Sequence, residues 1–208
     1  MLTGVILAGG ENRRMGGKHK ALLDLGGQTL IERQIAAMST ICPELIVVTN
    51  DPKRFLPVVD RSVRIITDFY PGKGPLGGIH AALSLTRNDN VWIVGCDMPY
   101  VSPDAAGLLL ERLQLAEADA AIPHVDGRLQ PLHAVYNRRC AEQAAALLAE
   151  EAYRVTGLLE RVRWEPVHDF EFEGRGIGTK FAVNTNTPEE WSEVLLSERS
   201  LPDTNNGR

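Results

Sequence analysis

The residues best suited to chemistry follow a short apolar run near the amino terminus. The segment VILAGGENRRMGGKHKALL (residues 5–23) passes from β-forming residues into glycines and then into basic side chains, at Arg13, Arg14, Lys18 and Lys20. Glycines allow backbone N–H groups to converge on an anion, and a row of cations suits a polyphosphate. The segment indicates a phosphate-binding loop. A glycine turn followed by a solvated basic loop is the alternative interpretation.

The glycine spacing in this segment differs from two familiar nucleotide-binding motifs. It fits neither GxGxxG nor the P-loop pattern GxxxxGK[ST]. A Rossmann-type dehydrogenase is therefore poorly supported, because no GxGxxG follows the first apolar run.

An aspartate follows another apolar run, in VWIVGCDMP (residues 91–99). Asp97, at the carboxyl end of a buried strand, can hold Mg²⁺, which prefers one or two carboxylates together with substrate phosphates. A capping role in the next helix is the alternative, but Ser102 before Pro103 already supplies that cap. We therefore favour a metal ligand. Cys96 beside it is predicted to be a small apolar filler rather than a nucleophile.

Asp68 also follows a predicted strand and leads into YPGKGPLGGI (residues 70–79). A loop so rich in glycine and proline can let a flat ring or a sugar lie against its backbone. A plain surface turn explains the same composition equally well.

The segment VNTNTPEE (residues 183–190) combines a helix start with two asparagines. Thr187 and Pro188 form an N-cap pattern with the acidic residues that follow. Asn184 and Asn186 are not explained by helix capping and are candidates for ligand contacts.

The elements that must position these residues alternate between strands and helices. Strands are predicted at residues 4–7, 45–49, 64–67, 91–95, 118–123, 132–136 and 181–183, and helices at residues 29–39, 76–86, 103–116, 138–151 and 188–196. The alternation predicts a single α/β domain over residues 1–199, with a mostly parallel central sheet flanked by helices on both faces. Ligands of such folds lie beyond the carboxyl ends of the strands. A polar tail, residues 200–208, is predicted to be disordered.

Composition narrows the functional classes. The 208 residues carry a formal net charge of −5, which argues against binding to nucleic acid or to a membrane surface. Three separated cysteines and five histidines show no metal-ligand spacing. The amino terminus lacks the features of a signal peptide, and no apolar run is long enough to span a membrane. We therefore expect a cytoplasmic protein.

Four motifs, taken in order along the chain, resemble one family. They are LAGGxxxRMGGxxK (residues 7–20), GPLGG (residues 74–78), CDMP (residues 96–99) and NTNTPEE (residues 184–190). The chain resembles the nucleotidyltransferases with a Rossmann-like domain, and within that superfamily the molybdenum cofactor guanylyltransferases. The resemblance extends from residue 3 to about residue 196.

The resemblance implies a nucleotide site and an acceptor site. Family members with Ala-Gly-Gly in the first loop typically use GTP, and this chain has Ala8-Gly9-Gly10. The implied nucleotide contacts are Leu7, Ala8, Gly9, Gly10, Lys20, Asp68 and Asp97, with Arg14 and Lys20 neutralising the triphosphate and Asp97 holding Mg²⁺. The implied substrate contacts are Asn184 and Asn186 near the reacting phosphates and Arg154 towards the pterin.

Two residues depart from the family pattern. His19 precedes Lys20 where the family usually has an acidic residue, and the carboxylate of Glu11 would lie beside the triphosphate. Neither departure removes a residue assigned to chemistry, but both bear on the phosphate contacts.

The implied reaction transfers GMP from GTP to the terminal phosphate of molybdopterin and releases pyrophosphate. That phosphate is ionised near neutral pH, so alignment and charge neutralisation by Lys20, Arg14 and Mg²⁺ on Asp97 would supply most of the catalysis. Implied partners are other proteins of molybdenum cofactor biosynthesis and acceptor molybdoenzymes. The alternatives are a cytidylyltransferase for molybdopterin or another phosphorylated molecule, and a catalytically silent nucleotide-binding domain.

Overall fold

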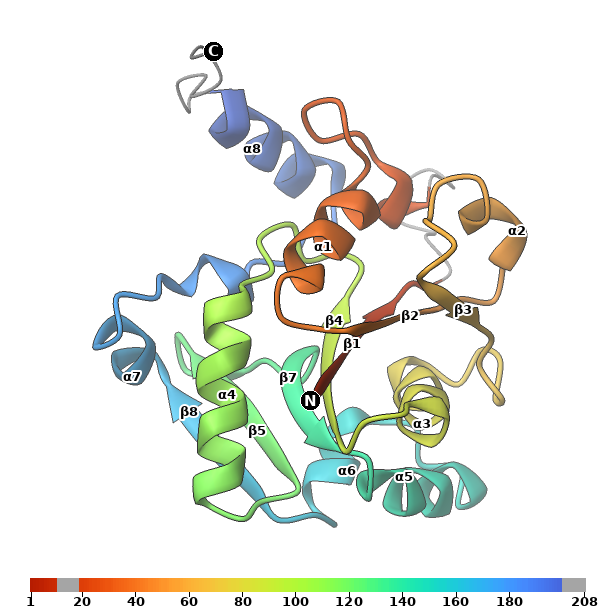
Figure 1. The fold of residues 1–208 in the computed structure, drawn as a ribbon, viewed down its shortest axis with the longest axis vertical. Coiled ribbons are helices and arrows are strands. Elements are labelled where there is room, and N and C mark those ends of the chain that lie inside the picture. Colours follow the sequence, from red (N-terminus) through yellow and green to blue (C-terminus); the bar gives the residue numbers. More distant parts are fainter. Residues whose placement is uncertain (11–18, 200–208) are drawn as a thin grey trace.

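One mixed sheet forms the centre of the computed structural model, which describes residues 1–10 and 19–199 (Figure 1). The strand order is β3-β2-β1-β4-β7-β5-β6, and β8 pairs with β5. The strands are β1 (Leu2–Leu7), β2 (Glu44–Val48), β3 (Arg64–Ile66), β4 (Asn90–Gly95), β5 (Ala120–Val125), β6 (Arg128–Leu129), β7 (His133–Asn137) and β8 (Trp164–His168).

The part of the sheet that carries the predicted motifs is parallel. β1 pairs in parallel with both β2 and β4, and β2 with β3. β7 runs antiparallel between β4 and β5, so that β5 and its parallel partner β8 again point the same way as β4. The predicted α/β fold with a mostly parallel sheet is therefore confirmed.

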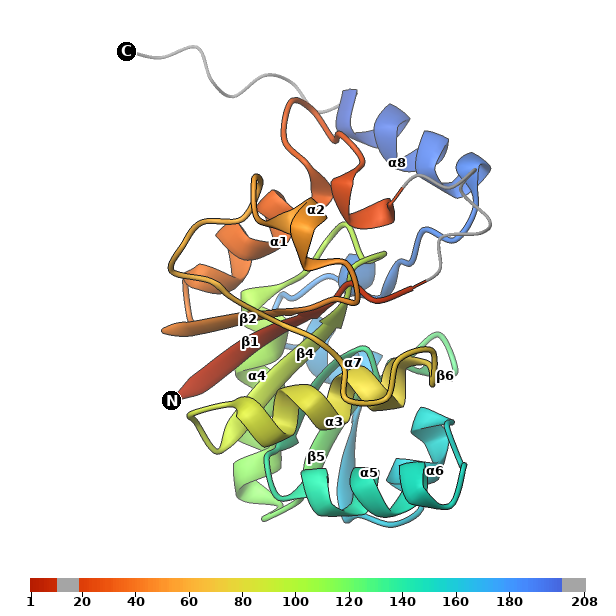
Figure 2. The same ribbon diagram turned by 90° about the vertical axis from the view of Figure 1, so that its right-hand side faces the viewer.

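Helices cover both faces of the sheet (Figure 2). They are α1 (Leu30–Ser39), α2 (Pro52–Phe55), α3 (Pro75–Leu85), α4 (Pro103–Leu115), α5 (Cys140–Ala149), α6 (Val155–Leu159), α7 (Asp169–Glu173) and α8 (Pro188–Arg199), with short 3₁₀ helices at Lys20–Leu22 and Thr179–Ala182. In Figure 2, α1 lies on one side of β1 and β4, and α3, α5 and α6 lie on the other.

Two apolar clusters fill the space between the sheet and these helices. Successive residues of a strand point to opposite faces, and β1 shows this directly. Ile6 belongs to the cluster that contains residues of α1 and α4, whereas Val5 belongs to the cluster of α3, α5 and α6. Burial on both faces explains why the central strands have continuous apolar sequences.

Local sequence explains where the two main helices of the first face begin. The Thr29 side chain accepts a hydrogen bond from the Glu32 backbone N–H, and the Glu32 carboxylate accepts one from the Thr29 N–H. This capping box starts α1. Ser102 Oγ accepts from the Ala105 N–H at 3.1 Å, and Pro103 occupies the first turn of α4, as predicted.

The predicted strand at residues 181–183 is wrong. This segment lies at the end of the 3₁₀ helix Thr179–Ala182 and in the extended residues that follow it. Phe181 is fully buried, with its ring against Phe172 and His133. Its apolar character therefore reflects burial and not strand pairing. The sequence analysis also missed β6, β8, α2, α6 and α7, which are short or contain polar residues.

Among the described residues, no helix combines the length and the apolar character needed to cross a membrane. The tail predicted for residues 200–208 lies outside the described residues.

Candidate active site

A cleft of about 510 Å³ opens at the carboxyl ends of the parallel strands. Its wall combines segments that follow β1, β2, β3 and β4, because the ends of parallel neighbours meet at one edge of the sheet. The residues lining the cleft are Leu7, Gly9, Gly10, Lys20, Val48, Thr49, Asn50, Asp68, Gly72, Gly74, Pro75, Gly78, Gly95, Cys96, Asp97, Leu132 and Asn186.

The first loop enters the cleft directly from β1. The Ala8 N–H donates to the Val48 carbonyl at 2.8 Å, which extends the pairing of β1 and β2, and the Ala8 side chain is buried in the core. Leu7, Gly9 and Gly10 line the cleft, whereas Ala8 supports them from behind. Within the described part of the chain, a methyl group at Gly10 would meet no atom within 4 Å.

Three polar side chains from distant parts of the chain converge in the cleft. Lys20 Nζ donates to Asn186 Oδ1 at 3.0 Å and lies 3.7 Å from Asp97 Oδ2. The Lys20 side chain is 13% exposed and that of Asp97 is 25% exposed. A cation and an anion thus share the part of the cleft next to the glycine loop.

Asn186 is fixed by the start of α8. The Glu190 carboxylate accepts hydrogen bonds from the backbone N–H groups of Asn186 and Thr187, and the Thr187 hydroxyl accepts one from the Glu190 N–H at 3.2 Å. The predicted N-cap pattern therefore has a second consequence, because it orients the asparagine that contacts Lys20.

The described residues compensate the charge on Asp97 only in part. Burial raises the pKa of Asp97, the Lys20 ammonium lowers it in part, and the nearby Glu190 carboxylate raises it further. A carboxylate with a raised pKa facing a cleft is a common mark of a functional site. An added cation would stabilise its ionised form.

Asp68 lies at the opposite wall of the cleft, where the GPLGG motif makes room for it. A Cβ atom at Gly77 would lie 2.5 Å from an Asp68 carboxylate oxygen, and one at Gly78 would lie 3.2 Å from the Leu7 side chain. The Asp68 carboxylate also accepts from the Tyr70 N–H at 2.7 Å. Burial raises the pKa of Asp68. Glycines at 77 and 78 thus let α3 approach the loops after β1 and β3.

Gly95 and Cys96 serve the position of Asp97. A Cβ atom at Gly95 would lie 2.6 Å from Asp97 Oδ1, so only glycine leaves space for that carboxylate. Cys96 is buried, and burial raises the pKa of its thiol to about 12. The thiol therefore stays protonated, which agrees with the predicted role as an apolar filler.

Besides Ala8, three predicted site residues do not line the cleft or lie outside the described residues. The Asn184 amide donates to the Ala182 carbonyl at 3.2 Å and does not line the cleft. Arg154 lines a separate hollow beside α6. Arg14, together with Arg13, Lys18 and Glu11, falls in residues 11–18, outside the described part of the chain.

Several lining residues were missed from the sequence. Thr49 and Asn50 follow β2 within LIVVTN and reach the cleft for the same reason as Asp68 and Asp97. The rule applied to the other strand ends could have found them, because a polar pair ends an apolar run. Leu132, which precedes β7, also lines the cleft.

The donor set fits a hard divalent cation only with help from a substrate. Among the described residues, no group of three or more His, Cys, Asp or Glu side chains could hold a metal ion. Asp97 supplies one half-buried carboxylate, and Mg²⁺ is commonly bound by one or two carboxylates plus substrate phosphates. The residues present therefore fit a metal that binds together with a nucleotide.

A parallel sheet whose carboxyl ends join a glycine loop, a lysine and a half-buried aspartate is typical of a nucleotide-binding α/β enzyme. The family described as "MobA-like NTP transferase domain" matches residues 4–165. The chain belongs to this family, which confirms the resemblance predicted from its four motifs.

Individual relatives agree with this assignment. A protein of Pelotomaculum thermopropionicum named "Probable molybdenum cofactor guanylyltransferase" is 34% identical over 95% of this chain and 94% of its own length. The crystal structure of molybdopterin-guanine dinucleotide biosynthesis protein A from Archaeoglobus fulgidus has a TM-score of 0.81 and 26% identity, covering 94% of this chain and 97% of that chain.

A third similarity is limited to the fold. The crystal structure of 4-diphosphocytidyl-2C-methyl-D-erythritol synthase from Anaerococcus prevotii has a TM-score of 0.69 and covers 96% of both chains, but its sequence identity is 15%.

Proposed function

We propose that the protein transfers GMP from GTP to the terminal phosphate of molybdopterin and releases pyrophosphate. The meeting of Lys20 and Asp97 beside the glycine loop supports this reaction, because a cation and a carboxylate suited to Mg²⁺ lie together next to the loop that we propose binds the triphosphate. The named guanylyltransferase that is 34% identical over nearly the whole chain supports the choice of substrates.

The reaction requires charge neutralisation more than proton transfer. A phosphate monoester oxygen of the acceptor, already ionised, attacks the α-phosphorus of GTP. A new P–O bond forms, the bond to the bridging oxygen breaks, and pyrophosphate leaves with that electron pair. Lys20 and the amides after β1 would hold the phosphates in line and offset their charge. Arg14 stays a predicted contributor to this task.

Asp97 would hold the divalent metal, which we propose to be Mg²⁺. When bound, the metal would polarise a phosphoryl oxygen and template the in-line geometry. The other nucleotide contacts proposed are Asp68, Leu7, Gly9 and Gly10, with Ala8 holding the loop against β2.

The proposed acceptor side of the site includes Asn186 and Arg154. Asn186 lines the cleft, whereas Arg154 lies beyond its rim. Lys73 lies in the loop between Gly72 and Gly74, at the rim of the cleft. Its Nζ atom is 4.5 Å from the centre of the Tyr153 ring, and this contact connects the loop to the turn that carries Arg154. We propose that the pterin extends across this rim towards Arg154. Asn184 would have to turn away from the Ala182 carbonyl to contribute.

The wider setting belongs to the same proposal. We assign the nucleotidyltransferase domain to residues 1–199 and place the reaction in the cytoplasm. Other proteins of molybdenum cofactor biosynthesis, and the molybdoenzymes that take up the product, are the proposed protein partners.

A cytidylyltransferase is less well supported. The relative of 34% identity is named a guanylyltransferase, whereas the cytidyl-type enzyme shares the fold at 15% identity. The Ala8-Gly9-Gly10 sequence of the first loop also favours GTP.

A pyrophosphate-release assay tests the proposal directly. Purified protein, molybdopterin and Mg²⁺ would be incubated with GTP, CTP, ATP or UTP in parallel. Release with GTP alone is expected. Release with CTP alone would reassign the nucleotide and keep the mechanism, and no release with any nucleotide would contradict the proposed reaction.

A further inference from the structure

A polar residue interrupts the buried face of α1. Ile31, Gln34 and Met38 follow helical spacing and are each fully buried. An amide buried among apolar side chains costs free energy unless it is hydrogen-bonded. Departures of this kind from the local pattern are expected mainly at functional sites, so the contacts of Gln34 require an explanation.

Gln34 donates two side-chain hydrogen bonds to the loop that carries Asp97. Its Nε2 group donates to the Gly95 carbonyl at 2.9 Å and to the Met98 carbonyl at 2.8 Å. These carbonyls flank Cys96 and Asp97 on both sides. The Oε1 atom is buried without a hydrogen-bond partner among the described residues. If the Gln34 amide were flipped, its Oε1 atom would face both carbonyl oxygens and be repelled by them. The two hydrogen bonds donated by Nε2 therefore determine the orientation of the amide.

One of the two carbonyls between Gly95 and Met98, that of Asp97, is bound by another segment of the chain. The Asp97 carbonyl accepts hydrogen bonds from the Thr185 backbone N–H at 2.8 Å and from the Thr185 hydroxyl at 3.0 Å. The carbonyls of Gly95, Asp97 and Met98 are thus all bound by residues distant in sequence. The backbone of the loop is fixed, and the Asp97 carboxylate is left to face the cleft.

We propose that Gln34 is a positioning residue, whose amide aims the Asp97 carboxylate at the metal and nucleotide. This inference rests on the proposed metal-binding role of Asp97. Removing the two donors would leave the Met98 carbonyl without its Gln34 partner and the Gly95 carbonyl with only the Met98 N–H, at 3.3 Å, and would let the loop move. Loss of a partner that orients a metal ligand typically costs about 10- to 100-fold in metal affinity or activity.

The test compares Gln34→Met with Ile31→Val. Methionine keeps the length and approximate volume of glutamine but donates no hydrogen bond, whereas Ile31→Val loosens the same buried face of α1 and leaves the loop contacts in place. Mn²⁺ binding in the presence of GTP would be followed by electron paramagnetic resonance, alongside kcat, KM for GTP and the melting temperature.

We expect Gln34→Met to raise the apparent Mn²⁺ dissociation constant and to lower kcat, each by about 10-fold or more, with a smaller change in KM. Ile31→Val should lower the melting temperature and leave Mn²⁺ binding unchanged. Gln34→Glu, which has the same shape but opposes a carboxylate to the two carbonyls, should bind Mn²⁺ no better than Gln34→Met.

Wild-type Mn²⁺ binding by Gln34→Met, or an equal loss in Ile31→Val, would overturn the inference. Asp97→Asn in the same titration separates this result from a failure of the proposed function. If Asp97→Asn loses Mn²⁺ binding and Gln34→Met keeps it, only the positioning role is wrong. If Asp97→Asn also binds Mn²⁺ normally, the metal-binding role of Asp97 is wrong.

Discussion

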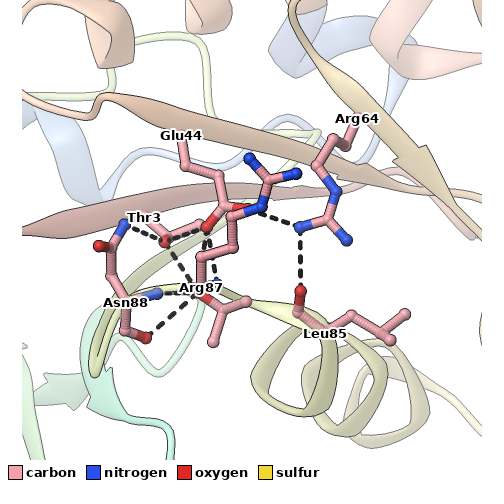
Figure 3. Close-up of polar contacts among 7 residues, drawn as sticks. Thr3, Glu44, Arg64, Leu85, Arg87 and Asn88 are labelled. Carbon is pink, nitrogen blue, oxygen red and sulfur yellow. Dashed lines mark hydrogen bonds and ion pairs between the residues drawn. The ribbon is translucent and has the colours of Figure 1, made fainter.

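Two carboxylates at opposite edges of the same sheet are held in opposite ways. Glu44, at the amino end of β2, has a side chain 9% exposed and accepts hydrogen bonds from Thr3 Oγ1 at 2.7 Å, Arg64 Nη1 at 2.5 Å and the Arg87 N–H at 2.9 Å (Figure 3). Burial by itself raises the pKa of Glu44, but these hydrogen bonds together hold it below its ordinary value. Asp97, at the carboxyl end of β4, keeps a raised pKa.

This difference in pKa indicates that the edge of the sheet at Glu44 has a structural role, whereas the edge at Asp97 has a functional one. Arg64 also donates to the Leu85 carbonyl at 2.9 Å, so the Glu44 cluster joins the amino ends of β1, β2 and β3 to the end of α3 (Figure 3). Nothing in that cluster needs a ligand to complete it. At the other edge the carbonyls of Gly95, Asp97 and Met98 are hydrogen-bonded, while the Asp97 carboxylate is only partly compensated by the described residues, which suits it to a bound cation.

The largest expected effect is the loss of catalytic rate caused by Asp97→Asn. This variant should lose about 10²- to 10³-fold or more in kcat, the range for removing one group that stabilises transition-state charge. Its free energy of unfolding should not fall, because a neutral amide relieves the burial of an under-compensated charge. Steady-state kinetics and urea denaturation would measure both. Normal activity at matched Mg²⁺ would contradict the role of Asp97.

Glu44→Gln should behave in the opposite way. An amide cannot accept all the hydrogen bonds that the carboxylate accepts, and it leaves Arg64 without its buried partner. The expected loss is about 1–3 kcal/mol in the free energy of unfolding, as for hydrogen bonds to charged groups. Activity at 25 °C should stay close to wild type. A fall in kcat without a loss of stability would break the contrast between the two edges.

The sequence predicted the active edge better than the structural one. Asp68 and Asp97 follow apolar runs, and the rule that ligands lie beyond strand ends placed both at one edge. Glu44, Arg64 and Thr3 have no such marker, because their proximity depends on the register between strands. Register is determined by packing of whole strands and cannot be deduced from one short segment.

Predictions that relied on local composition were less reliable. Phe181 suggested a strand but packs its ring into the core from a 3₁₀ helix. Gln34 gave no signal at all, since a glutamine at helical spacing looks like an exposed residue until the loop across from it is known. Asn50 follows β2 just as Asp97 follows β4, so the strand-end rule covers it as well.

A smaller effect is expected from Gly77→Ala, which disturbs the cleft without removing any charge. The new methyl group would displace the Asp68 carboxylate, which lies 2.5 Å from its position. We expect KM for GTP to rise about 10-fold, within the range for small misplacements at an active site. Gly107→Ala is the matched control on α4, because its methyl group meets no atom within 4 Å. That variant should gain about 0.5–1 kcal/mol in stability with unchanged kinetics.

The smallest effect is a difference in how stability depends on pH. Because the pKa of Glu44 is lower in the folded protein than its reference value of 4.5, its stabilising contribution is complete above that value and is lost as the pH falls through the folded pKa. The penalty of Glu44→Gln should therefore shrink in acid.

For Asp97, the pKa is raised above its reference value of 3.8. Its ionisation therefore costs stability, and this cost is absent below that reference value and grows as the pH rises through the folded pKa. Asp97→Asn should match wild type in acid and exceed it near neutrality. Urea unfolding of the nucleotide-free protein from pH 3 to pH 7 would measure both differences. Curves for the two variants that run parallel to wild type would show that the two carboxylates are held alike, and the contrast between the two edges of the sheet would then have to rest on ligand binding alone.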